Sequence, residues 1–249
     1  MTKQNLKDIV VILPGILGSV LQKNGKDLWI SGTSALANVA AAKSWNTELR
    51  LLNDSGKPEE AGDGVKAVGI LRGIGIVPGF WKWDGLGYTR LLQVIEENFK
   101  TVRALPEEGK LANLIEFPYD WRRDNRFTAQ WLSITVAKFL GQWREKSGNK
   151  DAKAIFIVHS MGGLVARYYL DVLGGWQNCR ALITLGTPFR GSPLAAGALS
   201  NGNRILGIID VSDALRTMDS PYQLLPSYRF VLNENEYHSL SGLQALPNI

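Results

Sequence analysis

The sequence predicts an α/β fold in which a mostly parallel sheet carries helices on both faces. Three apolar runs, Ile9–Leu13, Ala154–Val158 and Ala181–Leu185, have the length and character of buried strands. Stretches with helical periodicity lie between them, and such alternation favours right-handed crossovers and a parallel sheet. The chain has 249 residues, of which 45% are hydrophobic. It can therefore bury the core of one such domain or slightly more.

The N-terminal half shows two further apolar patterns. Apolar residues recur at helical spacing from Tyr88 to Phe99, which predicts a helix, and Leu114–Phe117 predicts a short strand that ends before Pro118. Residues 20–65 show no regular pattern, so we expect them to be irregular, with a weak strand near residues 66–68. Residues 69–87 are rich in glycine, which predicts a loop.

The C-terminal half predicts a long helix from Thr128 to Lys146, whose apolar stripe has helical spacing. A second helix follows Ser160 and should end at Gly174-Gly175. After Ser192 the pattern changes to helical and loop signals, with a strand expected only near residues 228–232. We therefore predict a hydrolase core over residues 1–192, with inserted membrane-contact and lid segments at about residues 20–87, and the start of a cap over residues 193–249.

The stretch from Ala154 to Leu170 combines a predicted buried strand, a tight His-Ser-Met-Gly-Gly turn and a helical pattern. This is the layout of a nucleophile elbow, in which a strained turn lifts a serine hydroxyl to the top of an α/β-hydrolase sheet. The turn needs small neighbours, and Gly162 supplies one two residues after Ser160. Val158 stands where the usual pattern has glycine, so the motif is a variant. The alternative is an ordinary serine at a strand–helix junction that caps the helix.

Acyl transfer by a serine also needs hydrogen-bond donors for the oxyanion. The backbone N–H of Met161, directly after Ser160, is the first expected donor. The second should come from the loop after an early strand, and we assign it to the N–H of Ile16 in the Gly-containing segment 14–18. A plain strand-to-loop turn is the alternative for this segment, because Pro-Gly is common in turns.

The base that would activate Ser160 is harder to assign, because the chain has only two histidines. His159 adjoins the nucleophile and should point away from it, so we expect His159 to be structural. His238 lies downstream, as the order Ser, Asp or Glu, His requires. The aspartates before His238 do not end a clear strand, which makes it a weak candidate. Asp120 precedes Ser160 in a loop, and we expect it to shape the floor of the site through an ion pair with an arginine.

Composition argues against several other kinds of site. The net charge is +5, and the densest basic cluster, residues 122–126, is short and interrupted, which disfavours nucleic-acid binding. The chain has no zinc-ligand spacing, Walker sequence or dinucleotide fingerprint, so we expect no metal and no cofactor. The aromatic residues Phe80, Trp81 and Trp83 suit a lipid interface, or else a loop folded onto the core.

Six short segments within residues 9–226 form a set: Pro14–Ser19, Val77–Phe80, Pro118–Arg122, His159–Gly163, Leu185–Pro188 and Tyr222–Pro226. The Leu-Gly-Thr-Pro segment is common among hydrolases, whereas the Pro-Tyr-Asp-Trp-Arg and Tyr-Gln-Leu-Leu-Pro segments are much more specific. In kind and order, the set resembles the lecithin:cholesterol acyltransferase family, which includes phospholipid:diacylglycerol acyltransferases and a lysosomal phospholipase.

This resemblance implies an α/β-hydrolase core and a lipid O-acyltransferase or phospholipase. Its serine would attack a glycerolipid ester, form an acyl-enzyme and pass the acyl group to an alcohol or to water. Carried over by position, Ser160 is the nucleophile, and the N–H groups of Ile16 and Met161 form the oxyanion hole. Residues 77–83 would lie in or beside a mobile lid. The alternatives are a general esterase or triacylglycerol lipase, and a non-catalytic lipid-binding relative.

The sequence departs from this family in two ways. The disulfide-forming cysteines of secreted members are absent, because Cys179 is the only cysteine, and the polar N-terminus does not resemble a secretory signal. We therefore expect a cytoplasmic protein that contacts a membrane surface peripherally. The family also places its catalytic aspartate and histidine on late strands beyond the cap. We expect these strands to be missing before Ile249, which would leave a sheet edge unpaired. The chain would then be a fragment, a protein completed from elsewhere or a pseudoenzyme.

Overall fold

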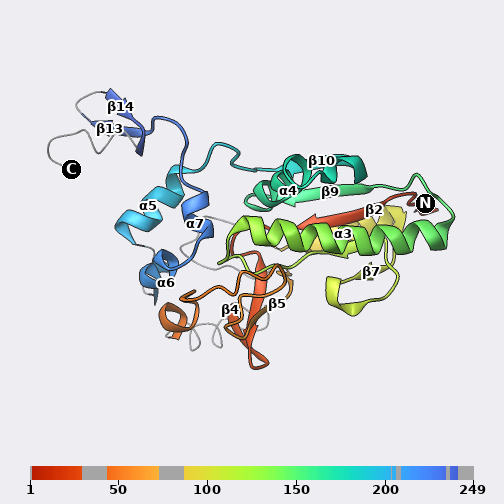
Figure 1. The fold of residues 1–249 in the computed structure, drawn as a ribbon, viewed down its shortest axis with the longest axis horizontal. Coiled ribbons are helices and arrows are strands. Elements are labelled where there is room, and N and C mark those ends of the chain that lie inside the picture. Colours follow the sequence, from red (N-terminus) through yellow and green to blue (C-terminus); the bar gives the residue numbers. More distant parts are fainter. Residues whose placement is uncertain are drawn as a thin grey trace.

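The computed structural model describes residues 2–29, 44–72, 87–202, 204–205, 209–233 and 236–240. Its centre is a five-stranded parallel sheet in the order β10-β9-β2-β8-β7 (Figure 1). These strands are β2 (Ile9–Leu13), β7 (Arg103–Ala104), β8 (Leu114–Glu116), β9 (Ala154–His159) and β10 (Cys179–Leu185). The predicted α/β fold with a mostly parallel sheet is therefore confirmed.

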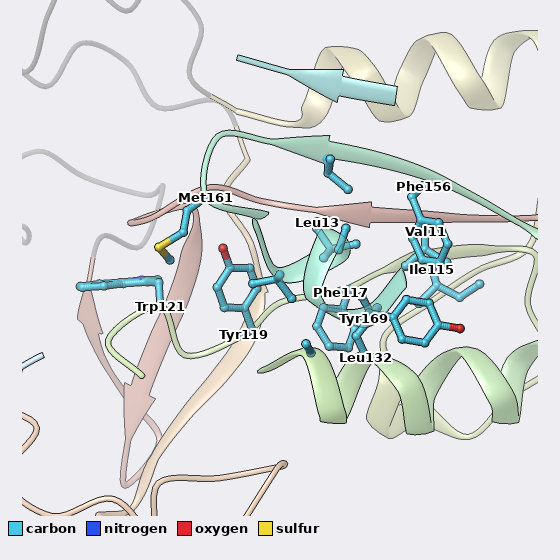
Figure 2. Close-up of a cluster of buried hydrophobic side chains, with 14 of the residues drawn as sticks. Val11, Leu13, Ile115, Phe117, Tyr119, Trp121, Leu132, Phe156, Met161 and Tyr169 are labelled. Atoms are coloured by element: carbon cyan, nitrogen blue, oxygen red, sulfur yellow. The ribbon is translucent and has the colours of Figure 1, made fainter. Parts of the chain in front are cut away.

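Helices cover both faces of this sheet, and the alternation of side chains along β9 shows how. Phe156 and Val158 are buried in the larger core cluster, which also contains residues of α3 (Asn125–Ser147) and α4 (Gly162–Asp171). Figure 2 shows part of this cluster between the sheet and α3. Ile155 and Ile157 point to the opposite face, where they pack with residues of α2 (Thr89–Asn98). Two apolar faces covered by helices explain why β9 has a continuous apolar sequence.

The predicted helices occur close to their expected bounds. Helix α3 begins slightly earlier than predicted, because the Asp124 carboxylate accepts a hydrogen bond from the Arg126 amide and caps the helix. It ends at Gly148, whose φ of 68° is left-handed and suits glycine. Short 3-10 turns, Pro106–Glu108 and Gly175–Asn178, precede β8 and β10. A small parallel pair, β1 (Gln4–Asn5) with β6 (Phe99–Lys100), lies outside the main sheet.

The prediction that residues 20–65 are irregular is wrong in part. They contribute to an antiparallel three-stranded sheet in the order β4-β3-β5, formed by β3 (Ser19–Lys23), β4 (Lys26–Trp29) and β5 (Val65–Ile70). Asn24 and Gly25 both have positive φ, 52° and 73°, and join β3 to β4 in a tight hairpin. An Asn-Gly pair is the typical signal of such a turn. Leu21 and Trp29 continue the main core into this sheet.

The segment after residue 192 lies beyond the carboxyl ends of the parallel strands (Figure 1). It contains α5 (Pro193–Asn201), α6 (Ser212–Arg216) and α7 (Ser220–Gln223). Two antiparallel pairs accompany them: β11 (Arg204–Ile205) with β12 (Ile209–Asp210), and β13 (Val231–Asn233) with β14 (Glu236–His238). This arrangement is compatible with a cap that starts at residue 193, which stays a prediction.

The edge of the main sheet at β10 is open in the described part of the chain, since β10 pairs there with β9 alone. Ile183 and Leu185 are 46% and 42% exposed on this strand. Unpaired edges with apolar side chains promote association between chains, and this edge carries no proline.

We expect the isolated 249-residue chain to self-associate through β10, and Ile183→Lys to shift it toward monomer, because a charge opposes strand pairing. Sedimentation velocity at several concentrations measures the shift. Ile134→Lys is a matched control, because Ile134 is 47% exposed but lies on helix α3. Equal effects of both variants, or a monomeric parent chain, would contradict the prediction.

Candidate active site

Ser160 lies in the turn between β9 and α4, at the carboxyl end of the central sheet. Its φ is 49°, a conformation that non-glycine residues rarely adopt. Two backbone hydrogen bonds hold the turn. The Ser160 amide donates to the Leu185 carbonyl at 2.9 Å, and the Gly163 amide donates to the Ser160 carbonyl at 3.0 Å. A strained serine held in this way between a strand and a helix is the local geometry of a nucleophile elbow.

Close backbone approach explains the small residues after Ser160. A Cβ atom at Gly162 would collide with the Pro14 carbonyl oxygen, and one at Gly163 would collide with the Thr187 side chain. Val158 replaces the usual glycine before the serine without such a collision. Its side chain is fully buried in the core cluster with α3 and α4. The variant motif is therefore compatible with the elbow.

The loop after β2 lies directly against Ser160. A Cβ atom at Gly15 would come within 2.8 Å of the Ser160 Cβ atom. The backbone N–H groups of Ile16 and Met161 donate to no acceptor among the described residues. Met161 follows Ser160, and its buried side chain points towards Trp121 (Figure 2). Met161 directly follows the strained serine and Ile16 directly follows Gly15, so two N–H groups without an acceptor among the described residues are compatible with an oxyanion hole. The assignment of Ile16 and Met161 to it stays a prediction.

The two histidines have different places in the structure. The His159 Nδ1 atom lies 2.9 Å from the Tyr88 hydroxyl oxygen, which fits the expected structural role. His238 lies on β14, in a hairpin beyond α5 and α7 and away from the end of β9 (Figure 1). The structure does not bring it to Ser160. No described residue hydrogen-bonds the Ser160 hydroxyl, so the base remains unassigned.

The pKa of His159 gives a test of its buried position. Burial lowers the pKa of His159 below 6.5, because the charged imidazolium is poorly solvated there. Below about pH 6.5 the unfolded chain therefore binds more protons than the folded protein, and the free energy of unfolding falls as the pH falls. We expect a smaller fall in His159→Asn, measured by urea unfolding at about pH 7.5 and about pH 5.5. An equal fall in variant and parent would contradict the buried, neutral state.

Asp120 forms the expected ion pair with an arginine. Both oxygens of its carboxylate accept hydrogen bonds from the fully buried Arg122 guanidinium, at 2.9 and 2.6 Å. The same guanidinium lies 3.0 Å from the Asp63 carboxylate. Sequence analysis missed the part played by Asp63, because that residue lies in a stretch with no regular pattern. The Asp120 carboxylate is therefore engaged by Arg122, and no hydrogen bond among the described residues joins it to Ser160.

The family model for lecithin:cholesterol acyltransferase matches residues 25–236, which is most of the chain. The chain belongs to the lecithin:cholesterol acyltransferase family. This membership places it among proteins of the lipid acyltransferase and esterase type. The matched range includes Ser160 and the loop that contains Asp120, although it begins after Ile16.

A search of solved structures finds similarity to the Bacillus licheniformis lipase BlEst2 in mature form, with 15% identity and a TM-score of 0.40. The match covers 86% of this chain and 56% of the lipase, so the chain spans little more than half the length of that protein. The search of curated proteins finds no match.

The Tyr-Gln-Leu-Leu-Pro segment of this acyltransferase-family chain contacts residues that follow the Pro-Tyr-Asp-Trp-Arg loop closely in sequence. The Gln223 side chain accepts a hydrogen bond from the Asn125 amide at 2.8 Å and donates one to Asp124 at 2.7 Å. This contact joins the segment to the start of α3. Gly191 allows a second junction, because a Cβ atom there would collide with the Leu225 carbonyl. Together these contacts attach the segment after residue 192 near the carboxyl end of the sheet.

No other feature of the described residues of this family member forms a candidate site as well defined as the turn at Ser160. A shallow depression of about 870 Å³ lies near the amino ends of the strands and has Lys3, Lys7 and Lys100 in its lining, away from Ser160. Within the described ranges, no group of three or more His, Cys, Asp and Glu residues could hold a metal. No helix there is long and apolar enough to cross a bilayer. The aromatic stretch Phe80–Trp83 lies outside the described residues.

Proposed function

We propose that this chain carries the nucleophile of a serine-dependent lipid acyltransferase or phospholipase that acts on glycerolipid esters. One observation carries the proposal: Ser160 adopts a φ of 49° between β9 and α4, and Gly15 packs against it. Strained non-glycine residues cluster at active sites, and this one carries a hydroxyl where a glycine-containing loop passes close by. Membership of the lecithin:cholesterol acyltransferase family supports the lipid as substrate class.

The proposed reaction has two halves. The Ser160 hydroxyl oxygen attacks the ester carbonyl carbon, its proton goes to a general base, and the alcohol part of the lipid leaves with a proton. The N–H groups of Ile16 and Met161 would stabilise the negative oxygen of each tetrahedral intermediate. The hydroxyl of an acceptor alcohol or of water then attacks the acyl-enzyme. This step releases a new ester or a fatty acid and restores the serine.

Peripheral contact with a membrane is part of the proposal. The Leu71 carbonyl accepts a hydrogen bond from the Tyr88 amide at 2.9 Å, and the Leu71 amide donates to the Gly18 carbonyl. The described ends of this stretch, Leu71 and Tyr88, therefore lie beside the Gly15 loop. The sequence between them contains Phe80, Trp81 and Trp83, and aromatic side chains of this kind favour a lipid–water interface. Vesicle flotation of Trp81→Ser/Trp83→Ser against the parent chain tests this contact.

The test of the activity uses vesicles of acyl-labelled phosphatidylcholine, with and without a long-chain alcohol as acceptor. We expect Ser160-dependent loss of the label from the phospholipid and its appearance in a new ester when the acceptor is present. Appearance only as fatty acid would favour a plain esterase or lipase. Vesicle binding that persists in Ser160→Ala, with no turnover by the parent chain, would overturn the catalytic proposal in favour of a lipid-binding relative.

A further inference from the structure

One peptide group next to Ser160 is hydrogen-bonded from both sides by tyrosines. The N–H of Gly15 donates to the Tyr88 hydroxyl oxygen at 2.9 Å. The C=O of Pro14, which belongs to the same peptide group, accepts a hydrogen bond from the Tyr119 hydroxyl at 2.8 Å. Both tyrosine side chains are buried. They come from different parts of the fold, one before α2 and the other after β8.

The backbone around each tyrosine is fixed independently. The Tyr119 amide donates to the Ser19 hydroxyl at 3.0 Å, and the Tyr88 amide donates to the Leu71 carbonyl at 2.9 Å. Burial raises the pKa of Tyr88 to about 12 and the pKa of Tyr119 well above its usual value, so both hydroxyls remain protonated at neutral pH. The Tyr88 oxygen, which accepts from Gly15, also lies 2.9 Å from His159 Nδ1, and it donates its proton there in the His159 tautomer whose Nδ1 carries no hydrogen.

The backbone at Gly15 needs these hydrogen bonds because only a glycine can pass so close to Ser160. A side chain at this position would strike Ser160, so the site requires glycine. Glycine, however, allows the backbone many conformations. The Gly15–Ile16 peptide, which carries the Ile16 N–H, is held by a hydrogen bond from the Gly18 amide to the Gly15 carbonyl at 3.0 Å. The preceding Pro14–Gly15 peptide must be held as well if the direction of the Ile16 N–H is to be fixed. Leu17, two residues after Gly15, adds strain with a φ of 64°.

We propose that Tyr88 and Tyr119 are positioning residues, which hold the Pro14–Gly15 peptide from both sides. Together with the hydrogen bond from the Gly18 amide to the Gly15 carbonyl on the next peptide, they fix the direction of the Ile16 N–H at Ser160. This inference deepens the proposed function and rests on it for its catalytic meaning. A hydrogen bond at each end of one peptide group prevents that group from rotating. Preorganised donors of this kind stabilise an oxyanion without reorganisation during the reaction.

The two hydrogen bonds can be observed directly by NMR. The sequence contains two Pro-Gly pairs, Pro14-Gly15 and Pro78-Gly79. Labelling proline with carbonyl ¹³C and glycine with ¹⁵N therefore gives two signals in an HNCO spectrum, and Gly79→Ala assigns them. In Tyr88→Phe we expect faster exchange of the Gly15 amide proton. In Tyr119→Phe we expect a changed ¹³C shift of the Pro14 carbonyl. An unchanged signal in either variant would overturn the inference.

The catalytic part is tested with the same variants and a soluble p-nitrophenyl ester. We expect kcat to fall about tenfold in each, as for loss of one supporting hydrogen bond, with KM unchanged. Tyr222→Phe is the matched control and should keep the parent rate, because its hydroxyl bonds the Arg216 carbonyl at 3.1 Å in the segment after residue 192.

The outcomes separate this inference from the proposed function. Parent activity with unchanged kcat in both tyrosine variants would leave the function standing and overturn the positioning role. A raised KM with unchanged kcat would also overturn it, because ground-state binding would then be affected. A parent chain with no Ser160-dependent turnover would overturn the proposed function and, with it, the catalytic role of the tyrosines. The NMR signals would still show whether the tyrosines hold the peptide.

Discussion

A single methyl group added at Gly15 is expected to lower the rate of Ser160 acylation by about 100-fold or more, the effect of losing an oxyanion donor. The new Cβ atom of Gly15→Ala would lie 2.8 Å from the Ser160 Cβ atom and 3.0 Å from His159 Nδ1. Either the serine or the loop that carries Ile16 must move. The rate of reaction with a fluorophosphonate, compared between variant and parent, measures the loss.

Gly69→Ala is the matched control for this prediction. Gly69 lies on β5, its φ is not left-handed, and a Cβ atom there meets no atom within 4 Å. We expect this variant to react at the parent rate. A Gly15→Ala protein that also reacts at the parent rate would show that the loop after β2 does not take part in the chemistry.

Replacing Arg122 by leucine is expected to lower the free energy of unfolding by about 3 to 5 kcal/mol. The Arg122 side chain is 0% exposed and lies between the carboxylates of Asp120 and Asp63. Its removal leaves the buried Asp120 carboxylate without a counter-ion, which costs more than the ion pair itself contributes. Urea unfolding followed by tryptophan fluorescence measures the change.

Arg126→Leu provides the comparison, because Arg126 also pairs with a buried aspartate, Asp124, but its own side chain is 62% exposed. An exposed partner is screened by water, so we expect a much smaller loss of stability than in Arg122→Leu. Similar losses in the two variants would contradict the role assigned to burial. An unaffected Arg122→Leu protein would show that Asp120 finds another partner or water.

Sequence patterns predicted the parts of the fold in which the apolar pattern of a segment matches the burial of that segment in the folded protein. The apolar runs that became β2 and β9 have both faces covered, so their sequence is continuous and easily recognised. The run that became β10 was recognised from the same pattern, although Ile183 and Leu185 are exposed on it. The long helix α3 was predicted from its apolar stripe. Of the antiparallel sheet β4-β3-β5, only a weak strand within β5 was predicted, because these short strands carry mixed sequence and β3 pairs with β5 far along the chain. The turn pair Asn24-Gly25 was the signal that could have revealed it.

The candidate site likewise contains residues that local motifs predicted and residues that only the folded structure reveals. The position of Ser160 followed from a contiguous motif, and the ion pair of Asp120 from a short charged string. Tyr88, Asp63 and Gln223 were not predicted, because each contacts the site region through residues distant in sequence. A lone tyrosine or glutamine has no local pattern that distinguishes a hydrogen-bonding role from a surface one. Only the assembled fold brings Tyr88 and Tyr119 to the same peptide.

The central claim is that Ser160 is an activated nucleophile, and intact-mass spectrometry after incubation with a fluorophosphonate tests it most directly. The account predicts one added phosphonyl group per parent chain and none on Ser160→Ala, with both proteins folded by circular dichroism. A folded parent chain that gains no mass, or a Ser160→Ala protein that gains the same mass, would contradict the claim.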